Sequence, residues 1–181
     1  MAVVRIDKDS AQRLYQVTED GKGFRLLSGT IDSVAYFCWL DDSLAAIVVL
    51  NSGMELHLLN VATGESKLLR RGVGRSIQRY PGTDDIMFTI PGDSLMVMRY
   101  HYPEGTFSQT CAAPGQSADF AFGPDGTLFA SDQGKLVIWR KGFRSWQPQE
   151  DIGKTIGMFY RLSVSRDGRM ISVVTYSGTK P

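Results

Sequence analysis

Short apolar segments alternate with turn residues along the whole chain, and they recur at a regular spacing. Acidic turn sites, separated by 43, 41 and 42 residues, fall at Asp41, Asp84, Asp125 and Asp167. Each is followed by a β-rich stretch, at residues 44–50, 86–90, 127–130 and 170–174. Asp and Gly favour the tight turns that join antiparallel strands, so the pattern predicts a hairpin at each site.

A second series of turn residues lies out of phase with the acidic sites. It consists of Gly21, Gly64, Gly105 and Gly142, each between two further strand-like segments. The repeating unit is therefore four short antiparallel strands in about 42 residues, and no long stretch shows helical periodicity. One such unit cannot cover both of its faces, so neighbouring units must stack. We predict an all-β fold, a β-propeller rather than a two-sheet sandwich, because a sandwich does not explain the regular period.

We interpret residues 1–181 as a single propeller segment. The phase of the repeat, meaning where each unit begins and ends, divides this segment into blades. Lettering the strands A to D outward from the propeller axis, three complete blades are expected at 31–72, 73–114 and 115–153. Residues 1–30 supply the end of strand B and then strands C and D of an earlier blade. Residues 154–181 supply strands A and B of a last one. The expected fold class is therefore a partial propeller of about four blades.

The repeats also resemble a known family. The segment 120–128, with an aromatic residue, then Pro-Asp-Gly, then an aliphatic strand, resembles the WD40-like repeat of TolB-type β-propellers. Residues 58–65 and 162–170 share the likeness, whose specificity lies in the repetition. The resemblance implies a binding module rather than an enzyme. It also implies that the module has a protein partner and lies in the periplasm.

The phase of the repeat and this resemblance together bear on whether the blades of this chain close into a ring. Both ends of the chain supply a B strand, so they compete for one position if the ring is to close. We therefore expect the C-terminal part of a longer, six-bladed propeller, the alternative being three blades and a fourth shared between the ends. The exposed flanks of the terminal blades predict a homodimer.

Composition and charge exclude some classes of partner. The chain carries 20 Lys and Arg against 19 Asp and Glu, so there is no net field to attract a nucleic acid. Its longest aliphatic run, residues 44–50, is far shorter than the roughly 20 residues that span a bilayer. We expect neither nucleic-acid binding nor membrane insertion. The two cysteines, Cys38 and Cys111, define neither a disulfide framework nor a metal site, and their redox state stays open.

Candidate catalytic and metal-binding motifs are weak. Gly92-Asp93-Ser94-Leu95 matches a serine-esterase motif, but neither histidine is preceded by Asp at the third position before it, as that chemistry needs. Ser94 is therefore assigned to a hairpin loop. His57 and His101 are interpreted as exposed strand residues, and the acidic pairs at 41–42 and 84–85 as turn formers. We expect no enzyme centre, metal or cofactor.

Two further groups have simple structural interpretations. Lys67, Arg70, Arg71 and Arg75 form a basic cluster, which we assign to a solvated loop rather than to an anion site. Trp139 and Trp146 flank one hairpin. We expect them to pack between blades, the alternative being a stacking surface for a ligand.

The most informative positions lie just ahead of the aromatic anchor of each A strand. They are Tyr36, Gln78, Asp119 and Arg161, separated by 42, 41 and 42 residues. Equivalent positions in successive blades should meet around the channel mouth, where a partner or small molecule would bind. The alternative is that they only fill the channel with hydrogen-bonded groups. The function expected is a non-enzymatic protein-interaction or ligand-binding module. A gating propeller of a larger, prolyl-oligopeptidase-like hydrolase is the alternative.

Overall fold

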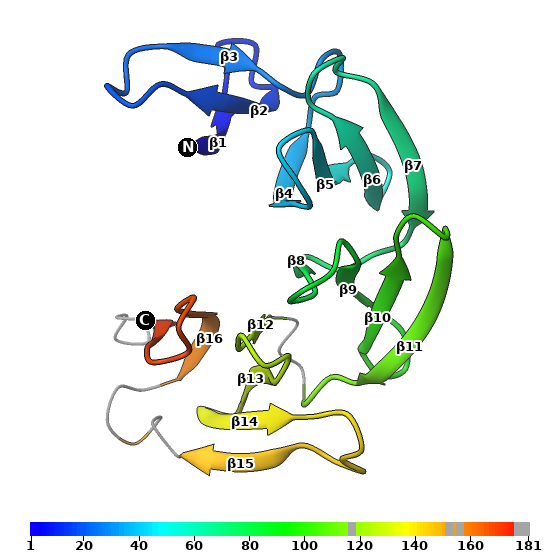
Figure 1. The fold of residues 1–181 in the computed structure, drawn as a ribbon, viewed down its shortest axis with the longest axis vertical. Helices are drawn as coiled ribbons and strands as arrows, with labels where there is room; N and C mark the ends of the chain where they lie inside the picture. The colour runs from blue at the N-terminus through cyan, green and yellow to red at the C-terminus, as the bar shows by residue number, and fades with distance from the viewer. Residues whose placement is uncertain (116–118, 151–153, 155–157, 176–181) are drawn as a thin grey trace.

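The computed structural model describes residues 1–115, 119–150, 154 and 158–175. These residues form an all-β structure of seventeen strands in five antiparallel sheets. The sheets stand around a common axis in an open arc, with the first and last sheets at its two ends (Figure 1). The prediction of a partial propeller is confirmed. Within the described residues, no helix has the length and apolar character needed to cross a membrane.

The sheets follow one another along the chain without exchanging strands. The first contains β1 (Ala2–Ile6), β2 (Gln12–Val17) and β3 (Phe24–Leu26). The second contains β4 (Val34–Trp39), β5 (Leu44–Leu50), β6 (Met54–Asn60) and β7 (Ser66–Arg71). The third contains β8 (Ile77–Arg79), β9 (Ile86–Ile90), β10 (Met96–His101) and β11 (Thr106–Ala112). The fourth contains β12 (Phe120–Phe122), β13 (Leu128–Asp132), β14 (Lys135–Trp139) and β15 (Gln147–Glu150), and the fifth β16 (Phe159–Val164) and β17 (Ile171–Thr175).

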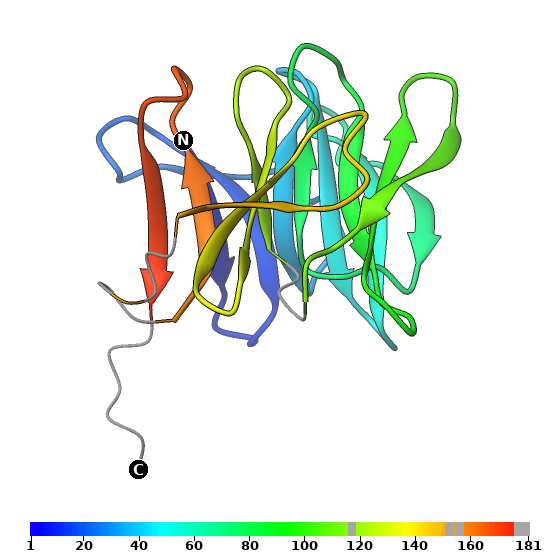
Figure 2. The ribbon, with the colours of Figure 1, turned by 90° about the horizontal axis from the view of Figure 1, so that it is seen from below.

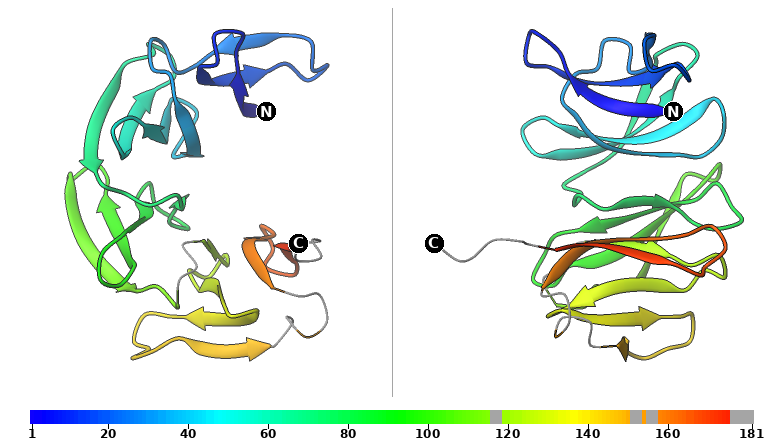
Figure 3. Two further views of the ribbon diagram at one scale, coloured as in Figure 1. Left: turned by 180° about the vertical axis from the view of Figure 1, so that it is seen from behind. Right: turned by 90° about the vertical axis from the view of Figure 1, so that its left-hand side faces the viewer.

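Each four-stranded sheet runs outward from the axis in chain order. Strands β4, β8 and β12 lie innermost, and β7, β11 and β15 lie at the periphery (Figure 1). Seen from the side, the inner strands run roughly along the axis (Figure 2). Two further views show the sheets stacked one after another around the arc (Figure 3). This arrangement brings the starts of successive blades together at the centre.

Alternation along single strands explains why the sheets must stack. In β5, Ala45, Ile47 and Val49 belong to an apolar cluster shared with the first sheet. The intervening Ala46 and Val48 belong to a second cluster, shared with the third sheet. Because side chains alternate between the faces of a strand, β5 is buried from both sides. An isolated sheet would expose one of these faces to water.

The same arrangement repeats one sheet further along. Met87 and Val97 of the third sheet pack with Phe120, Phe122 and Leu128 of the fourth sheet in a third cluster. The two tryptophans at 139 and 146 pack against it, and the Trp146 Nε1 donates a hydrogen bond to the carbonyl of Ala112, 2.7 Å away. The tryptophans therefore pack between blades, as expected from the sequence. Full burial of a Met, Val, Leu or Phe side chain in such a cluster stabilises the stack by about 1.5–3 kcal/mol.

Three of the four acidic sites close their turns as expected. The Asp41 Oδ1 accepts hydrogen bonds from the backbone N–H groups of Ser43 and Leu44, at 2.6 and 2.8 Å. Asp125 and Asp167 accept equivalent bonds from the residue two positions on, at 3.0 and 3.1 Å. Such local bonds hold the turn conformation.

The interpretation of the pair at 84–85 as turn formers is wrong for Asp85. This carboxylate is buried, accepts a hydrogen bond from the Arg99 Nε at 2.6 Å and another from the backbone N–H of Tyr102 at 2.9 Å. It ties the start of β9 to β10 and to the loop that follows β10. A buried carboxylate requires such partners, and they lie 14 and 17 residues away.

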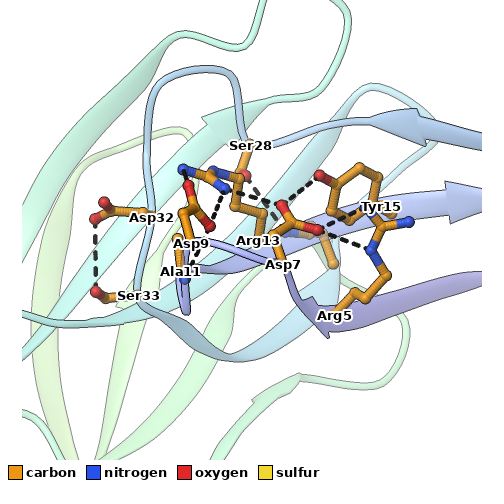
Figure 4. Close-up of polar contacts among 10 residues, drawn as sticks. Arg5, Asp7, Asp9, Ala11, Arg13, Tyr15, Ser28, Asp32 and Ser33 are labelled. Atoms are coloured by element: carbon orange, nitrogen blue, oxygen red, sulfur yellow. Dashed lines mark hydrogen bonds and ion pairs between the residues drawn. The ribbon is translucent and has the colours of Figure 1, made fainter.

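A polar network closes the hairpin between β1 and β2 (Figure 4). Asp7 accepts hydrogen bonds from the Tyr15 hydroxyl at 2.6 Å, the Arg13 Nη1 at 2.9 Å and the Arg5 Nη2 at 2.6 Å. These bonds, with that of Tyr15 the strongest influence, hold the pKa of Asp7 well below its usual range. Arg13 also pairs with Asp9. The network satisfies its own charges, so we assign it a structural role.

Candidate functional site

The four positions that the repeat predicts at the channel mouth line one pocket. Tyr36 lies in β4, Gln78 in β8 and Arg161 in β16, and Asp119 immediately precedes β12. The pocket has a volume of about 390 Å³ and is also lined by Arg75. Val4 of β1 lines it as well, so all five sheets contribute to a single pocket.

Local irregularities place two of these side chains. The pairing of β4 with β5 shifts register between Val34 and Tyr36, and the pairing of β16 with β17 shifts between Phe159 and Arg161. An extra residue in one strand bends it and redirects the side chains that follow. The Arg161 guanidinium carbon lies 5.9 Å from the centre of the Tyr36 ring, at the outer limit of a cation–π contact. These two side chains meet from separate sheets.

Gln78 holds two neighbouring blades together. Its Nε2 donates a hydrogen bond to the carbonyl of Phe120 at 2.6 Å, and its Oε1 accepts one from the backbone N–H of Phe122 at 3.3 Å. Both ends of the amide are therefore engaged with β12. This geometry corresponds to the channel-filling alternative for Gln78.

Asp119 forms an ion pair that sequence reasoning missed. The Arg75 Nη2 lies 2.6 Å from the Asp119 Oδ2, and the two side chains are 35% and 14% exposed. Burial raises the pKa of the Asp119 carboxyl above its ordinary value, while the charges of Arg75 and Arg161 act in the opposite direction. The assignment of Arg75 to a solvated loop is therefore wrong. No sequence signal identifies the pair, because its members lie 44 residues apart.

The charges in the pocket do not balance. Two guanidinium groups, those of Arg75 and Arg161, face a single carboxylate, that of Asp119. Arg161 is exposed; its guanidinium lies near the Tyr36 ring, and its charge also acts on the Asp119 carboxyl, but no hydrogen bond or ion pair joins that guanidinium to another of the described residues. Guanidinium groups bind carboxylates and phosphates through paired hydrogen bonds. The arrangement can therefore hold one acidic group at the channel mouth.

The remaining members of the basic cluster, Lys67, Arg70 and Arg71, lie in strand β7, so their assignment to a loop is wrong, and each has different neighbours. The Arg71 Nε donates a hydrogen bond to the Glu55 Oε1 at 2.7 Å. The Arg70 guanidinium lies 5.7 Å from the centre of the Phe107 ring, and Lys67 lines a different pocket. The four residues therefore do not form one anion site.

The two histidines are half-buried rather than exposed, which corrects that expectation. The His57 Nε2 lies 3.3 Å from the Glu55 Oε2, and the His101 Nδ1 lies 3.2 Å from the Asp85 Oδ2. Ser94 lies exposed in the loop between β9 and β10, as expected. In the part of the chain that the structure describes, no three potential metal ligands of the His, Cys, Asp or Glu types lie together.

These features define a β-propeller arc with a charged pocket at its inner strands. No protein-family model matches the sequence, and the search of curated proteins found no match. Among solved structures, TolB from Acinetobacter baumannii is similar over 98% of this chain and 47% of its own, with a TM-score of 0.76 and 17% identity. A putative gluconolactonase is similar over 95% of this chain and 69% of its own, with a TM-score of 0.66 and 15% identity.

These likenesses establish the fold alone, which is that of a TolB-like propeller. The chain spans about half the length of the TolB structure that it matches.

Proposed function

We propose that this chain is a non-enzymatic, TolB-like interaction module that binds an acidic group of a protein partner at the channel mouth. The observation that carries the proposal is the pocket at the inner strands, in which Arg75 and Arg161 face the single carboxylate of Asp119. Arg75 is paired with that carboxylate, which leaves Arg161 as the cation available to a partner. Tyr36 offers a hydroxyl group and an aromatic face beside it.

The same geometry argues against acid–base chemistry in this pocket. A general base must be free to accept a proton from its substrate. The Asp119 carboxylate is instead engaged by the Arg75 guanidinium. The likeness to a putative gluconolactonase, at 15% identity, supports the propeller fold and not a reaction. A periplasmic location belongs to the proposal and is supported by the resemblance to TolB-type propellers.

The test compares Arg161→Ala with Arg166→Ala. Arg166 is an exposed arginine in the turn of the same sheet and does not line the pocket, so it controls for the loss of one positive charge. The probe is a fluorescein-labelled tetraglutamate peptide, measured by fluorescence anisotropy at low salt, where charge interactions are least screened. We expect Arg161→Ala to weaken binding at least about fivefold, or about 1 kcal/mol, and Arg166→Ala to leave it unchanged.

Thermal unfolding separates binding from structure. A melting temperature for Arg161→Ala within about 2 °C of the parent chain would support a binding role, because exposed substitutions cost little stability. Equal peptide affinity for the two variants would contradict the proposal. So would a large fall in melting temperature for Arg161→Ala, because the residue would then be holding the channel together.

A further inference from the structure

A second pocket lies between the third and fourth sheets. It has a volume of about 260 Å³ and shares no lining residue with the channel pocket. Its base is formed by the buried side chains of Met87, Phe122 and Leu128. Its walls include the aromatic rings of Tyr80 and Trp139. The strand β11 contributes the polar side chains of Ser108, Gln109 and Thr110. The site is thus a slot between two blades with an apolar base and a partly polar lining, and it is distinct from the channel pocket.

The aromatic wall is held in place by its neighbours. The Tyr80 ring meets the Phe122 ring edge-on, with centroids 5.3 Å apart. The Arg99 guanidinium carbon lies 4.2 Å from the centre of the same Tyr80 ring. Gly126, with φ of +80°, brings its turn so close that an added Cβ would lie 2.9 Å from the Tyr80 hydroxyl. A fixed aromatic wall over an apolar base suits a flat ring.

Three side chains that can carry a positive charge line this slot, and within the described part of the chain one of them has no partner. Arg99 and His101 also line it, but both contact the buried carboxylate of Asp85, at 2.6 and 3.2 Å. The His101 Nε2 lies 2.7 Å from the Ser108 Oγ, so both ring nitrogens are engaged. Lys141 is exposed and has no hydrogen-bond or ion-pair partner among the residues that the structure describes. Its ammonium group is the cation available to a ligand in the slot.

We propose that this interblade pocket binds a small aromatic carboxylate, with its ring on the apolar base beside Trp139 and its acid group at Lys141. The volume lies just below the roughly 300–1,000 Å³ of sites for drug-sized ligands, so it suits one ring with a short acidic arm. The apolar base recognises the ring, and the lysine selects the acid over its neutral analogue.

The test is a titration with 3-phenylpropionate and with its neutral amide, followed by ¹⁵N NMR of the tryptophan indole groups. The chain has three tryptophans, and Trp139→Phe assigns the resonance of the one in the slot. We expect 3-phenylpropionate to shift the Trp139 signal saturably, with a Kd in the approximately millimolar range of a fragment this small. Trp39, which packs between the first two sheets, is expected not to move.

Matched variants test the role of the charge. Lys141→Glu should weaken binding of the acid at least about fivefold and leave binding of the amide unchanged. Lys135 is an exposed lysine on the same hairpin but outside the pocket. The variant Lys135→Glu should therefore bind the acid as the parent chain does. Arg161→Ala should also bind it normally, which separates this site from the channel.

Three results would overturn the proposal. The first is a Trp139 signal that does not respond to the acid at about ten times the expected Kd. The second is equal affinity for the acid and the amide, because the lysine would then have no role. The third is a loss of affinity in Lys135→Glu as large as that in Lys141→Glu, because the effect would then report net charge.

Discussion

Replacing Arg75 with alanine removes the partner of a largely buried carboxylate. The Asp119 side chain is 14% exposed and is held by the Arg75 Nη2 at 2.6 Å. Leaving a buried hydrogen-bonding group without a partner costs about 1–3 kcal/mol. Arg75 is itself 35% exposed, so water screens part of the interaction, and we expect a loss of about 1–2 kcal/mol. For a chain of this size, that corresponds to a fall of about 2–8 °C in Tm.

The loss should depend on pH in a defined direction. Burial raises the pKa of Asp119 in the folded state above the ordinary value of 3.8. A carboxyl group with a raised pKa favours folding at acid pH, and that contribution is lost as the pH rises through the folded pKa. Removing Arg75 raises this pKa further. The stability that Arg75→Ala loses relative to the parent chain should therefore be largest near neutral pH. It should shrink as the pH falls toward 3.8, because Asp119 then takes up a proton.

The assay is thermal unfolding followed by circular dichroism at a series of pH values, with Asp119→Asn as the companion variant. Asparagine keeps the shape and one acceptor oxygen but removes the charge. In the Arg75→Ala background it should restore most of the stability at neutral pH. A deficit that is the same at every pH, or that persists in the double variant, would refute the reasoning.

Two other predictions concern packing and association. Phe88→Ala removes a fully buried ring from the cluster shared by the second and third sheets and should cost about 3–5 kcal/mol in chemical denaturation. Phe143→Ala changes a 37% exposed ring in a hairpin and should cost under about 1 kcal/mol. If Phe88→Ala and Phe143→Ala cost the same stability, the result would contradict the stacking of blades. Among the described strands, β17 pairs only with β16, and we propose that its free edge joins a second copy of the chain. Val174→Lys, at a 46% exposed position of β17, should then shift sedimentation equilibrium toward monomer, and an unchanged mass distribution would count against this edge.

The repeat could be found from the sequence because its signals are local. Asp41, Asp125 and Asp167 each bond to backbone groups two or three residues on, so the turn chemistry is visible in a short window. The burial of β5 on both faces follows from its continuous aliphatic run. The shared channel pocket could be predicted from the repeat spacing, because equivalent positions in stacked repeats lie at equivalent places around the axis.

The chemistry of the pockets could not be found in this way. Arg75 precedes β8 and meets Asp119 of the following blade, 44 residues on, so the pair exists only after the blades have stacked. Asp85 looked like a second turn residue, although it pairs with Arg99 inside its own sheet. Lys141 becomes a candidate binding residue only because it lines the slot that Phe122 and Trp139 form with the third sheet. In each case the partner is set by tertiary packing, which local patterns do not encode.

The contact of Gln78 with β12 offers the most direct measurement of how the blades are arranged. The Gln78 Nε2 lies 2.6 Å from the carbonyl of Phe120, and its Oε1 lies 3.3 Å from the backbone nitrogen of Phe122, across the boundary between two sheets. Stacked blades predict strong nuclear Overhauser effects from the Gln78 side-chain amide protons to the backbone protons of residues 120–122. Effects confined to the third sheet itself, with none to residues 120–122, would contradict a propeller whose inner strands share one axis.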